Sequence, residues 1–302
     1  MGRDPVAEVY RGYWHGEVAI KRFYLPNATP EQISWFKEEV SVLKKTRHEN
    51  LALFMGASLA PPNLAIVSSL CKGQTLYKTI HMWSEPFLVD KSIHIAKQIA
   101  QALGYLHARG IVHKDLNSRN VFLDPKDKVV ITNTGISSLN DSIWIQQHGL
   151  NEQRCAITPR TRLYYLAPEI VRALSPNPEL QENGDLYPYS EKTDIYAFGT
   201  VLYELLTRQF PFSMDKFGFP LNATAVIFMV GRGVRQEFHS REIPKKFKDL
   251  VWDCWHPQPH NRLPLSAIWD ILTKLSRKKT PISRSPSFPV NLSISNECLT
   301  VF

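Results

Sequence analysis

The chain has 302 residues, of which 43% are hydrophobic and 21% are charged, and its net charge is +8 at pH 7. This length allows one large core or two modest ones in a soluble globular protein. No apolar run approaches the roughly 20 residues that span a bilayer, and the N-terminus lacks the pattern of a signal peptide. Lysine and arginine are spread along the chain, which argues against nucleic acid as a partner. We therefore expect an intracellular, cytoplasmic protein whose four cysteines form neither a disulfide framework nor a zinc site.

The first 70 residues are predicted to form mostly sheet. Residues 8–23 alternate apolar and polar side chains around a central His-Gly pair, which is typical of a β-hairpin. Residues 50–59 and 63–70 indicate two short buried strands separated by a proline turn. Between the hairpin and these strands, Thr29 begins a capping box with a first-turn proline. An amphipathic helix should follow, with Glu39 at the margin of its apolar face.

Helices are predicted to predominate after Gly73. The clearest one carries apolar residues at helical spacing from Ile95 to Leu106 and should stop at Gly110. A later helix is expected over 196–206, and another is expected to end near residue 279. The chain beyond that point is rich in serine and proline, which argues against a packed core.

These patterns predict an α+β, bilobal protein. The expected domain covers residues 1–279, with a small β-rich lobe at 1–69, a hinge at 69–73 and a larger α-helical lobe at 74–279. Residues 280–302 are expected to be a flexible tail.

Several short motifs point to phosphoryl-transfer chemistry. Lys21 ends Val-Ala-Ile-Lys on the second hairpin strand, where its ammonium can reach nucleotide phosphates, and Glu39 is placed to pair with it. Taken singly, such a lysine and glutamate are usually solvated charges. The sequence HKDLNSRN, residues 113–120, follows a helix and matches a catalytic loop. By resemblance to protein kinases, Ala-Pro-Glu ending at Glu169 would close an activation segment, and Arg262 would be a buried partner for that glutamate.

In order and spacing, these motifs resemble those of protein kinases, which implies the bilobal protein-kinase fold. By that resemblance, Asp115 would accept the proton of a substrate hydroxyl beside Lys114, and Asn120 would hold a magnesium ion. Asp194 stands where kinases anchor the catalytic loop to a central helix. The residues that the resemblance places around ATP are Val9, Ala19, Lys21, Glu39, Ser68, Leu70, Cys71 and Phe122.

The kinase pattern is broken at the second metal position. Thirteen residues after Asn120, where kinases carry Asp-Phe-Gly, the chain reads Asn133-Thr134-Gly135. A neutral amide is a poor ligand for magnesium, and phosphoryl transfer depends on neutralised phosphate charge. The glycine-rich loop is eroded too, with Asp4 and Ala7 at glycine positions, and the first strand of the small lobe is expected to be missing. The sequence therefore predicts impaired catalysis and nucleotide binding that is weak or independent of magnesium. The alternative is that Asn133 is a harmless variant in an active enzyme.

Longer stretches resemble the RAF and kinase suppressor of Ras group. They are KTRHENLALFMGA at 45–57, PPNLAIVSSLCKG at 61–73 and GYLHARGIVHKDL at 104–116. HKDL, LAPEIVR and AFGT favour the suppressor branch. IFMVGRG at 227–233 is shared more closely with RAF, and Lys21 differs from suppressors that carry arginine there, so a divergent RAF-like kinase remains an alternative.

The suppressor resemblance implies a scaffold of the Ras–MAP kinase cascade. It implies side-to-side pairing with RAF through Arg47 and a MEK-facing helix at Phe228 and Met229. In the tail, Ser287 has the spacing of a phosphoserine site read by 14-3-3 proteins. Regions preceding this chain would recruit the protein to the plasma membrane. The alternatives are an exposed charge at Arg47, core packing at Phe228 and Met229, and a slow ATP-dependent Ser/Thr kinase in place of the pseudokinase.

Overall fold

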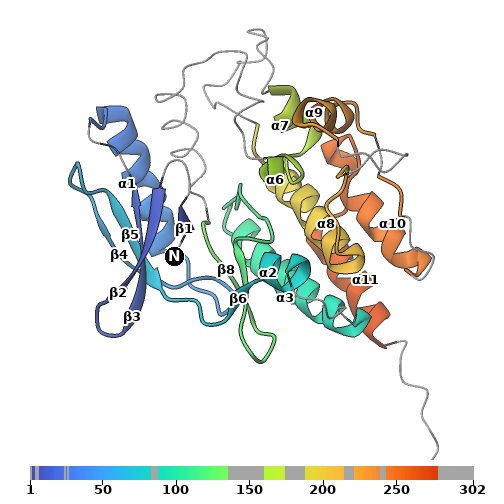
Figure 1. Ribbon diagram of the computed structural model, residues 1–302, viewed down its shortest axis with the longest axis horizontal. Coiled ribbons are helices and arrows are strands. Elements are labelled where there is room, and N and C mark those ends of the chain that lie inside the picture. The colour runs from blue at the N-terminus through green and yellow to red at the C-terminus, as the bar shows by residue number, and fades with distance from the viewer. Residues whose placement is uncertain are drawn as a thin grey trace, which may run out of the picture.

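The computed structural model describes residues 2–3, 7–23, 25, 27–82, 88–134, 160–173, 188–213, 221–234, 236–238 and 243–277. Strands and one helix form the part that contains the N-terminus, and helices dominate the rest, as Figure 1 shows. The predicted α+β, bilobal arrangement is confirmed. Within the described residues, we find no helix with the length and apolar character required to cross a bilayer.

The first part is built on a five-stranded sheet with the order β1-β2-β3-β5-β4. Its strands are β1 (Gly2–Arg3), β2 (Ala7–Tyr13), β3 (Glu17–Phe23), β4 (Phe54–Ser58) and β5 (Ala65–Ser69). β2 and β3 pair antiparallel, and His15 and Gly16 turn the chain between them with φ of 51° and 131°. Glycine adopts the second of these values without a Cβ clash. The predicted hairpin is thus confirmed.

The expectation that the small lobe lacks its first strand is wrong. Gly2 and Arg3 pair with Val9 and Glu8 across the free edge of β2. Two residues are too few to show the period-two alternation by which strands are recognised in a sequence. The pairing of β1 becomes visible only once the edge of β2 is in place.

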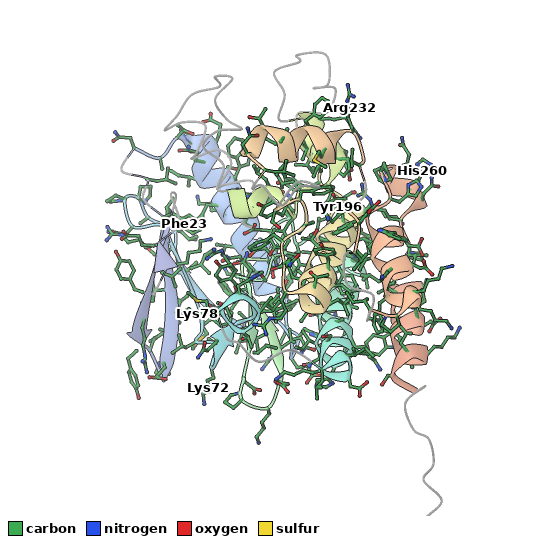
Figure 2. The ribbon with its side chains drawn as sticks, turned by 45° about the vertical axis from the view of Figure 1, so that its right-hand side comes forward. Phe23, Lys72, Lys78, Tyr196, Arg232 and His260 are labelled. Carbon is green, nitrogen blue, oxygen red and sulfur yellow. The ribbon has the colours of Figure 1, made fainter. Side chains whose placement is uncertain are left out.

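Helix α1 (Pro30–Lys44) begins with the predicted capping box. Gln32 N donates to Thr29 Oγ1 at 3.3 Å, and Thr29 N donates to Gln32 Oε1 at 3.0 Å. On its inner face, Phe36 meets Phe23 of β3 edge-on, with ring centroids 5.5 Å apart. Figure 2 labels Phe23 in this layer between sheet and helix. This small core holds α1, and therefore Glu39, against the sheet.

The second part contains a three-stranded sheet and a helical core. Its elements are β6 (Gln74–Thr75), α2 (Leu76–His81), α3 (Val89–His107), β7 (Val121–Leu123), β8 (Val129–Ile131), α6 (Arg160–Leu163), α7 (Pro168–Ala173), α8 (Glu191–Thr207), α9 (Ala223–Gly231), α10 (Lys245–Cys254), a 3-10 turn (Pro259–Asn261) and α11 (Leu265–Arg277). The predicted apolar stripe of α3 from Ile95 to Leu106 is fully buried. α8 is buried along most of its length and packs against α3 and α10. It is the central helix on which the site is assembled.

The two sheets are joined by residues 70–73, between the end of β5 and the start of β6. This short connection coincides with the expected hinge, while the predicted lobe limits stay a prediction. The expected tail at 280–302 lies outside the described residues, as do Asp4 of the eroded loop and Gly135.

Candidate catalytic site

The loop that carries Asp115 is anchored to α8 by a buried carboxylate. Asp194, in the first turn of α8, is 1% exposed. Its Oδ2 accepts from His113 N at 2.7 Å and lies 2.8 Å from His107 Nε2, and its Oδ1 accepts from Lys114 N at 2.9 Å. Lys114 has a left-handed φ of 68°, which costs a non-glycine residue free energy unless its surroundings hold it there. The predicted anchoring role of Asp194 is confirmed.

His113 links this loop to the segment that follows β8. Its Nδ1 accepts from Asp115 N at 3.2 Å and its Nε2 lies 3.0 Å from the carbonyl oxygen of Thr132. A carbonyl can only accept, so Nε2 carries the proton and the imidazole is neutral. Complete burial lowers the pKa of His113, which favours the same neutral form. His113 therefore holds two segments of the site in register.

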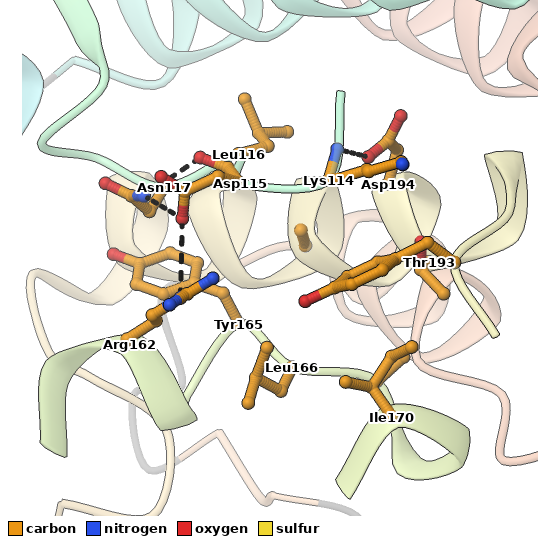
Figure 3. Close-up of a pocket in the computed structure, with 13 residues that line it drawn as sticks. Lys114, Asp115, Leu116, Asn117, Arg162, Tyr165, Leu166, Ile170, Thr193 and Asp194 are labelled. Carbon is orange, nitrogen blue, oxygen red and sulfur yellow. Dashed lines mark hydrogen bonds and ion pairs between the residues drawn. The ribbon is translucent and has the colours of Figure 1, made fainter. Parts of the chain in front are cut away.

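The Asp115 carboxylate is already engaged by several donors. Asn120 Nδ2 donates to its Oδ2 at 2.8 Å, and Asn117 Nδ2 donates to its Oδ1 at 3.2 Å. Arg162, from α6, brings its Nε to 3.7 Å from Oδ1. Figure 3 shows Arg162 approaching Asp115 from the side opposite the catalytic loop. The sequence did not predict this ion pair, because no spacing rule connects Arg162 with Asp115.

Two asparagine amides connect Asp115 with the sheet. Asn133 Nδ2 donates to Asn120 Oδ1 at 2.8 Å, and Lys21 Nζ donates to Asn133 Oδ1 at 3.3 Å. The ammonium of Lys21 can only donate, so the oxygen of Asn133 faces it. Asn120 Nδ2 faces two oxygens of Asp115, at 2.8 Å each, so its oxygen faces Asn133. Each neighbour thus fixes the orientation of the next amide.

This arrangement does not fit a magnesium ion. The side-chain oxygen of Asn120 accepts the amide hydrogen of Asn133, and the oxygen of Asn133 faces a lysine cation. Magnesium usually takes one or two carboxylates together with water and phosphate oxygens in a near-octahedral shell, and Asp115 supplies the one carboxylate among these side chains. An aspartate at position 133 could not donate the hydrogen bond that closes the pair. The predicted metal pair, Asn120 and Asn133, is therefore brought together as a hydrogen-bonded pair of amides.

Four of the residues predicted to surround a nucleotide share one face of the sheet. Val9 lies directly opposite Lys21, and Ala19 lies directly opposite Ser68. Ala19 and Lys21 are two residues apart on β3, so their side chains point to the same face, as do those of their cross-strand partners. The Lys21 side chain is buried.

The other predicted nucleotide residues lie around the hinge and in α1. Leu70 and Cys71 follow β5, and burial raises the pKa of the Cys71 thiol to about 11, so it stays protonated near neutral pH. Phe122 is the central residue of β7. Glu39 lies in α1, and its pairing with Lys21 stays a prediction.

The predicted pair of Glu169 and Arg262 is confirmed. Arg262 Nη1 and Nη2 each donate to one carboxylate oxygen of Glu169 at 2.7 Å, in a bidentate arrangement. Arg262 is 1% exposed, and it also donates to the carbonyl oxygens of Lys192 and His256. The ring of Tyr196, labelled in Figure 2, lies 5.2 Å from its guanidinium carbon. This pair fixes α7 to the helical core.

A second buried polar cluster was not predicted. Glu204 of α8 is fully buried and accepts hydrogen bonds from the hydroxyls of Tyr165 and Ser118, the latter at 2.9 Å. His81 Nε2 lies 2.8 Å from the same carboxylate. Burial raises the pKa of Tyr165 well above its ordinary value, so its hydroxyl remains a donor. The cluster ties the segment before α7 to the catalytic loop.

Two of the three predicted partner residues, Arg47 and Phe228, are exposed. Arg47 is exposed, and its backbone nitrogen donates to the Tyr105 hydroxyl at 2.8 Å. Phe228 is 57% exposed, with the Arg232 guanidinium 4.3 Å from its ring centroid, while Met229 packs partly against the core. The alternative interpretation of these two residues as core residues therefore holds for Met229 and not for Phe228. The phosphoserine candidate, Ser287, lies outside the described residues.

Comparison with known proteins identifies the family. Residues 1–272 match the family described as protein tyrosine and serine/threonine kinase. Kinase suppressor of Ras 2 of Homo sapiens is 38% identical over 288 residues, which cover 95% of this chain and 29% of that protein. Its Mus musculus counterpart gives the same identity and coverage. The chain therefore spans less than a third of the length of these relatives.

The predicted resemblance to the kinase suppressor of Ras group is confirmed by this similarity, which extends over nearly the whole chain. The strand-rich first part, the anchored catalytic loop and the Glu169–Arg262 pair occur in the order that the kinase motifs predicted. The chain belongs to the protein tyrosine and serine/threonine kinase family.

Proposed function

We propose that this chain acts as a pseudokinase, a scaffold and allosteric activator in the Ras–RAF–MEK–ERK cascade. The observation that carries the proposal is the hydrogen bond from Asn133 Nδ2 to Asn120 Oδ1. This hydrogen bond uses the oxygen of Asn120 that would bind a metal ion, and its donor is the residue that stands where kinases place the second metal ligand. The similarity to proteins named kinase suppressor of Ras supports the assignment to a Ras pathway.

The electrostatics of the site favour this proposal over catalysis. Phosphoryl transfer is accelerated mainly by positioning and by neutralising charge on the phosphates. Here the positive charge of Lys21 is directed at Asn133, and no second carboxylate joins Asp115 in the amide chain. A nucleotide at the face formed by Val9, Ala19 and Lys21 would bind as a structural ligand, weakly or without magnesium.

The proposed partners follow from the family resemblance and from exposure. RAF would pair side to side through Arg47, which is exposed, and MEK would bind at Phe228, whose large apolar ring is mostly solvent-accessible. A 14-3-3 protein would read phosphorylated Ser287. We propose that the protein acts in the cytoplasm and is recruited to the plasma membrane.

Two assays on purified protein test the proposal. In the first, radiolabelled phosphate transfer by the unmodified chain should equal the background of Asp115→Asn. In the second, the unmodified chain should stimulate RAF to phosphorylate MEK, and Arg47→His should lose that stimulation. Lys37→His is the matched control, because Lys37 is an exposed cation on α1 outside the proposed surface. Stimulation that survives Arg47→His, or label incorporation that Asp115→Asn abolishes, would refute the corresponding part.

The second candidate function is a slow ATP-dependent Ser/Thr kinase of the RAF-like group. It is favoured by the intact anchoring of the catalytic loop, in which Asp194 holds Lys114 and Asn120 orients Asp115. Label incorporation lost in Asp115→Asn but retained in Arg47→His would favour this candidate over the scaffold.

A further inference from the structure

Arg162 lies beside the carboxylate of Asp115, the group predicted to accept the proton of a substrate hydroxyl. Its Nε lies 3.7 Å from Asp115 Oδ1, and the two side chains are only 30% and 18% exposed. With Asn120 on Oδ2 and Asn117 on Oδ1, both carboxylate oxygens already have donors. Phosphoryl transfer would require a substrate hydroxyl to give its proton to this carboxylate. The oxygen of the substrate hydroxyl would then bond to the γ-phosphorus while the bond between that phosphorus and ADP breaks. Such a hydroxyl would share the carboxylate with these donors, so it needs open space beside Arg162.

A small cavity lies beside Asp115, and Arg162 forms part of its wall. The cavity that Arg162, Asp115 and Asn117 line together with Tyr165 and Ile170 has a volume of about 20 Å³. Figure 3 shows these side chains converging on it. Such a volume holds about one water molecule. A serine or threonine with its flanking backbone is larger than this cavity.

Arg162 is held there by the buried cluster described above. Tyr165 N donates to the carbonyl oxygen of Arg162 at 3.1 Å. The Tyr165 hydroxyl is bonded to Glu204 and lies 2.9 Å from the hydroxyl of Ser118, which belongs to the same loop as Asp115. Leu163 is buried in the helical core immediately after Arg162. The backbone that carries the guanidinium is thus fixed relative to the carboxylate.

We propose that Arg162 is a plug on the acceptor side of Asp115, which excludes protein hydroxyls from the site independently of the altered metal position. The inference deepens the proposed pseudokinase function and rests on it for its biological meaning. It adds a second obstacle to catalysis, which acts at the carboxylate of Asp115 and not at the metal position of Asn133. Restoring a carboxylate at position 133 would then leave the acceptor side closed.

Carbodiimide labelling of carboxylates, read by mass spectrometry, tests the plug without any need for activity. Arg162→Thr should raise labelling of Asp115 severalfold, because the carboxylate loses its cover. Arg162→Lys should leave labelling close to that of the unmodified chain, because a cation on a long stem remains. Glu38, an exposed carboxylate on α1, provides the internal reference. Equal labelling of Asp115 in Arg162→Thr and in the unmodified chain would overturn the inference.

A second measurement uses the competition between water and a protein hydroxyl. In Asn133→Asp supplied with magnesium and ATP, we expect hydrolysis to exceed transfer to MEK, since water fits the cavity. Adding Arg162→Thr should raise the ratio of transfer to hydrolysis about a hundredfold, the scale of general-base catalysis. An unchanged ratio, or a double variant that binds magnesium and ATP but transfers nothing, would overturn the inference. Phosphorylation of MEK by the unmodified chain would refute the proposed function and the plug together, whereas equal labelling of Asp115 would overturn the plug alone.

Discussion

Replacing Asp194 by asparagine should destabilise the protein substantially although the side chain keeps its shape. Three donors converge on this carboxylate, from His113, Lys114 and His107, at 2.7–2.9 Å. An amide oxygen in the place of Oδ2 keeps two of them, and its NH₂ then faces the backbone N–H of Lys114. One unsatisfied buried donor costs about 1–3 kcal/mol, and loss of charge on the two remaining hydrogen bonds costs about 1 kcal/mol each. We therefore expect the free energy of unfolding to fall by about 3–5 kcal/mol.

Urea unfolding followed by tryptophan fluorescence measures this loss. The matched control is Asp270→Asn, the same substitution at an exposed position of α11, which should change the stability by no more than about 0.5 kcal/mol. A loss for Asp194→Asn that is no larger than the loss for the control would refute the reasoning. It would show that the catalytic loop is held by contacts other than this carboxylate.

Three further predictions concern the anchors around the site. Arg262→Met leaves Glu169 without its bidentate partner and should lower the free energy of unfolding in urea by about 3–5 kcal/mol. The double variant Glu169→Gln/Arg262→Met should lose less stability than the sum of the losses in the two single variants. A loss in the double variant equal to the sum of the single losses would argue against a stabilising interaction between the two side chains. Burial lowers the pKa of His113 in the folded state below its ordinary 6.5. As the pH falls, the unfolded chain is therefore protonated at this histidine before the folded chain is. The free energy of unfolding should then decrease as the pH drops below about 6.5. The stability advantage of the unmodified chain over His113→Gln should therefore shrink between about pH 7.5 and pH 5.5, and an advantage that grows would contradict this sign. Thr29→Ala removes one half of the capping box and should cost about 1 kcal/mol, while Thr29→Ser should cost much less; equal losses would mean that the hydroxyl does not cap α1.

The sequence predicts most of the framework because its signals are local. The capping box at Thr29, the hairpin and the apolar stripe of α3 each follow from residues within a few positions of one another. The pairing of Glu169 with Arg262, 93 residues apart, was predictable for a different reason. It rests on a family pattern, and no periodicity in the chain indicates it.

The contacts that decide the chemistry were beyond sequence reasoning. The sequence shows that Asn133 replaces an aspartate, but only the structure shows that its amide donates to Asn120. The direction of that bond depends on Lys21, 112 residues away. Arg162 and Glu204 carry no motif, because their roles depend on how α6 and α8 pack around the catalytic loop. The two-residue strand β1 was missed because it is too short to have a period.

Binding of ATP with and without magnesium tests the central claim most directly. A fluorescent ATP analogue titrated against the unmodified chain should give the same affinity in magnesium as in EDTA, because the amide pair leaves no ligand set for the ion. Asn133→Asp should gain about tenfold in affinity when magnesium is present, or about 1.4 kcal/mol. Asn27→Asp, the same substitution at an exposed position, should gain nothing. A clear strengthening of ATP binding by magnesium in the unmodified chain would contradict the account.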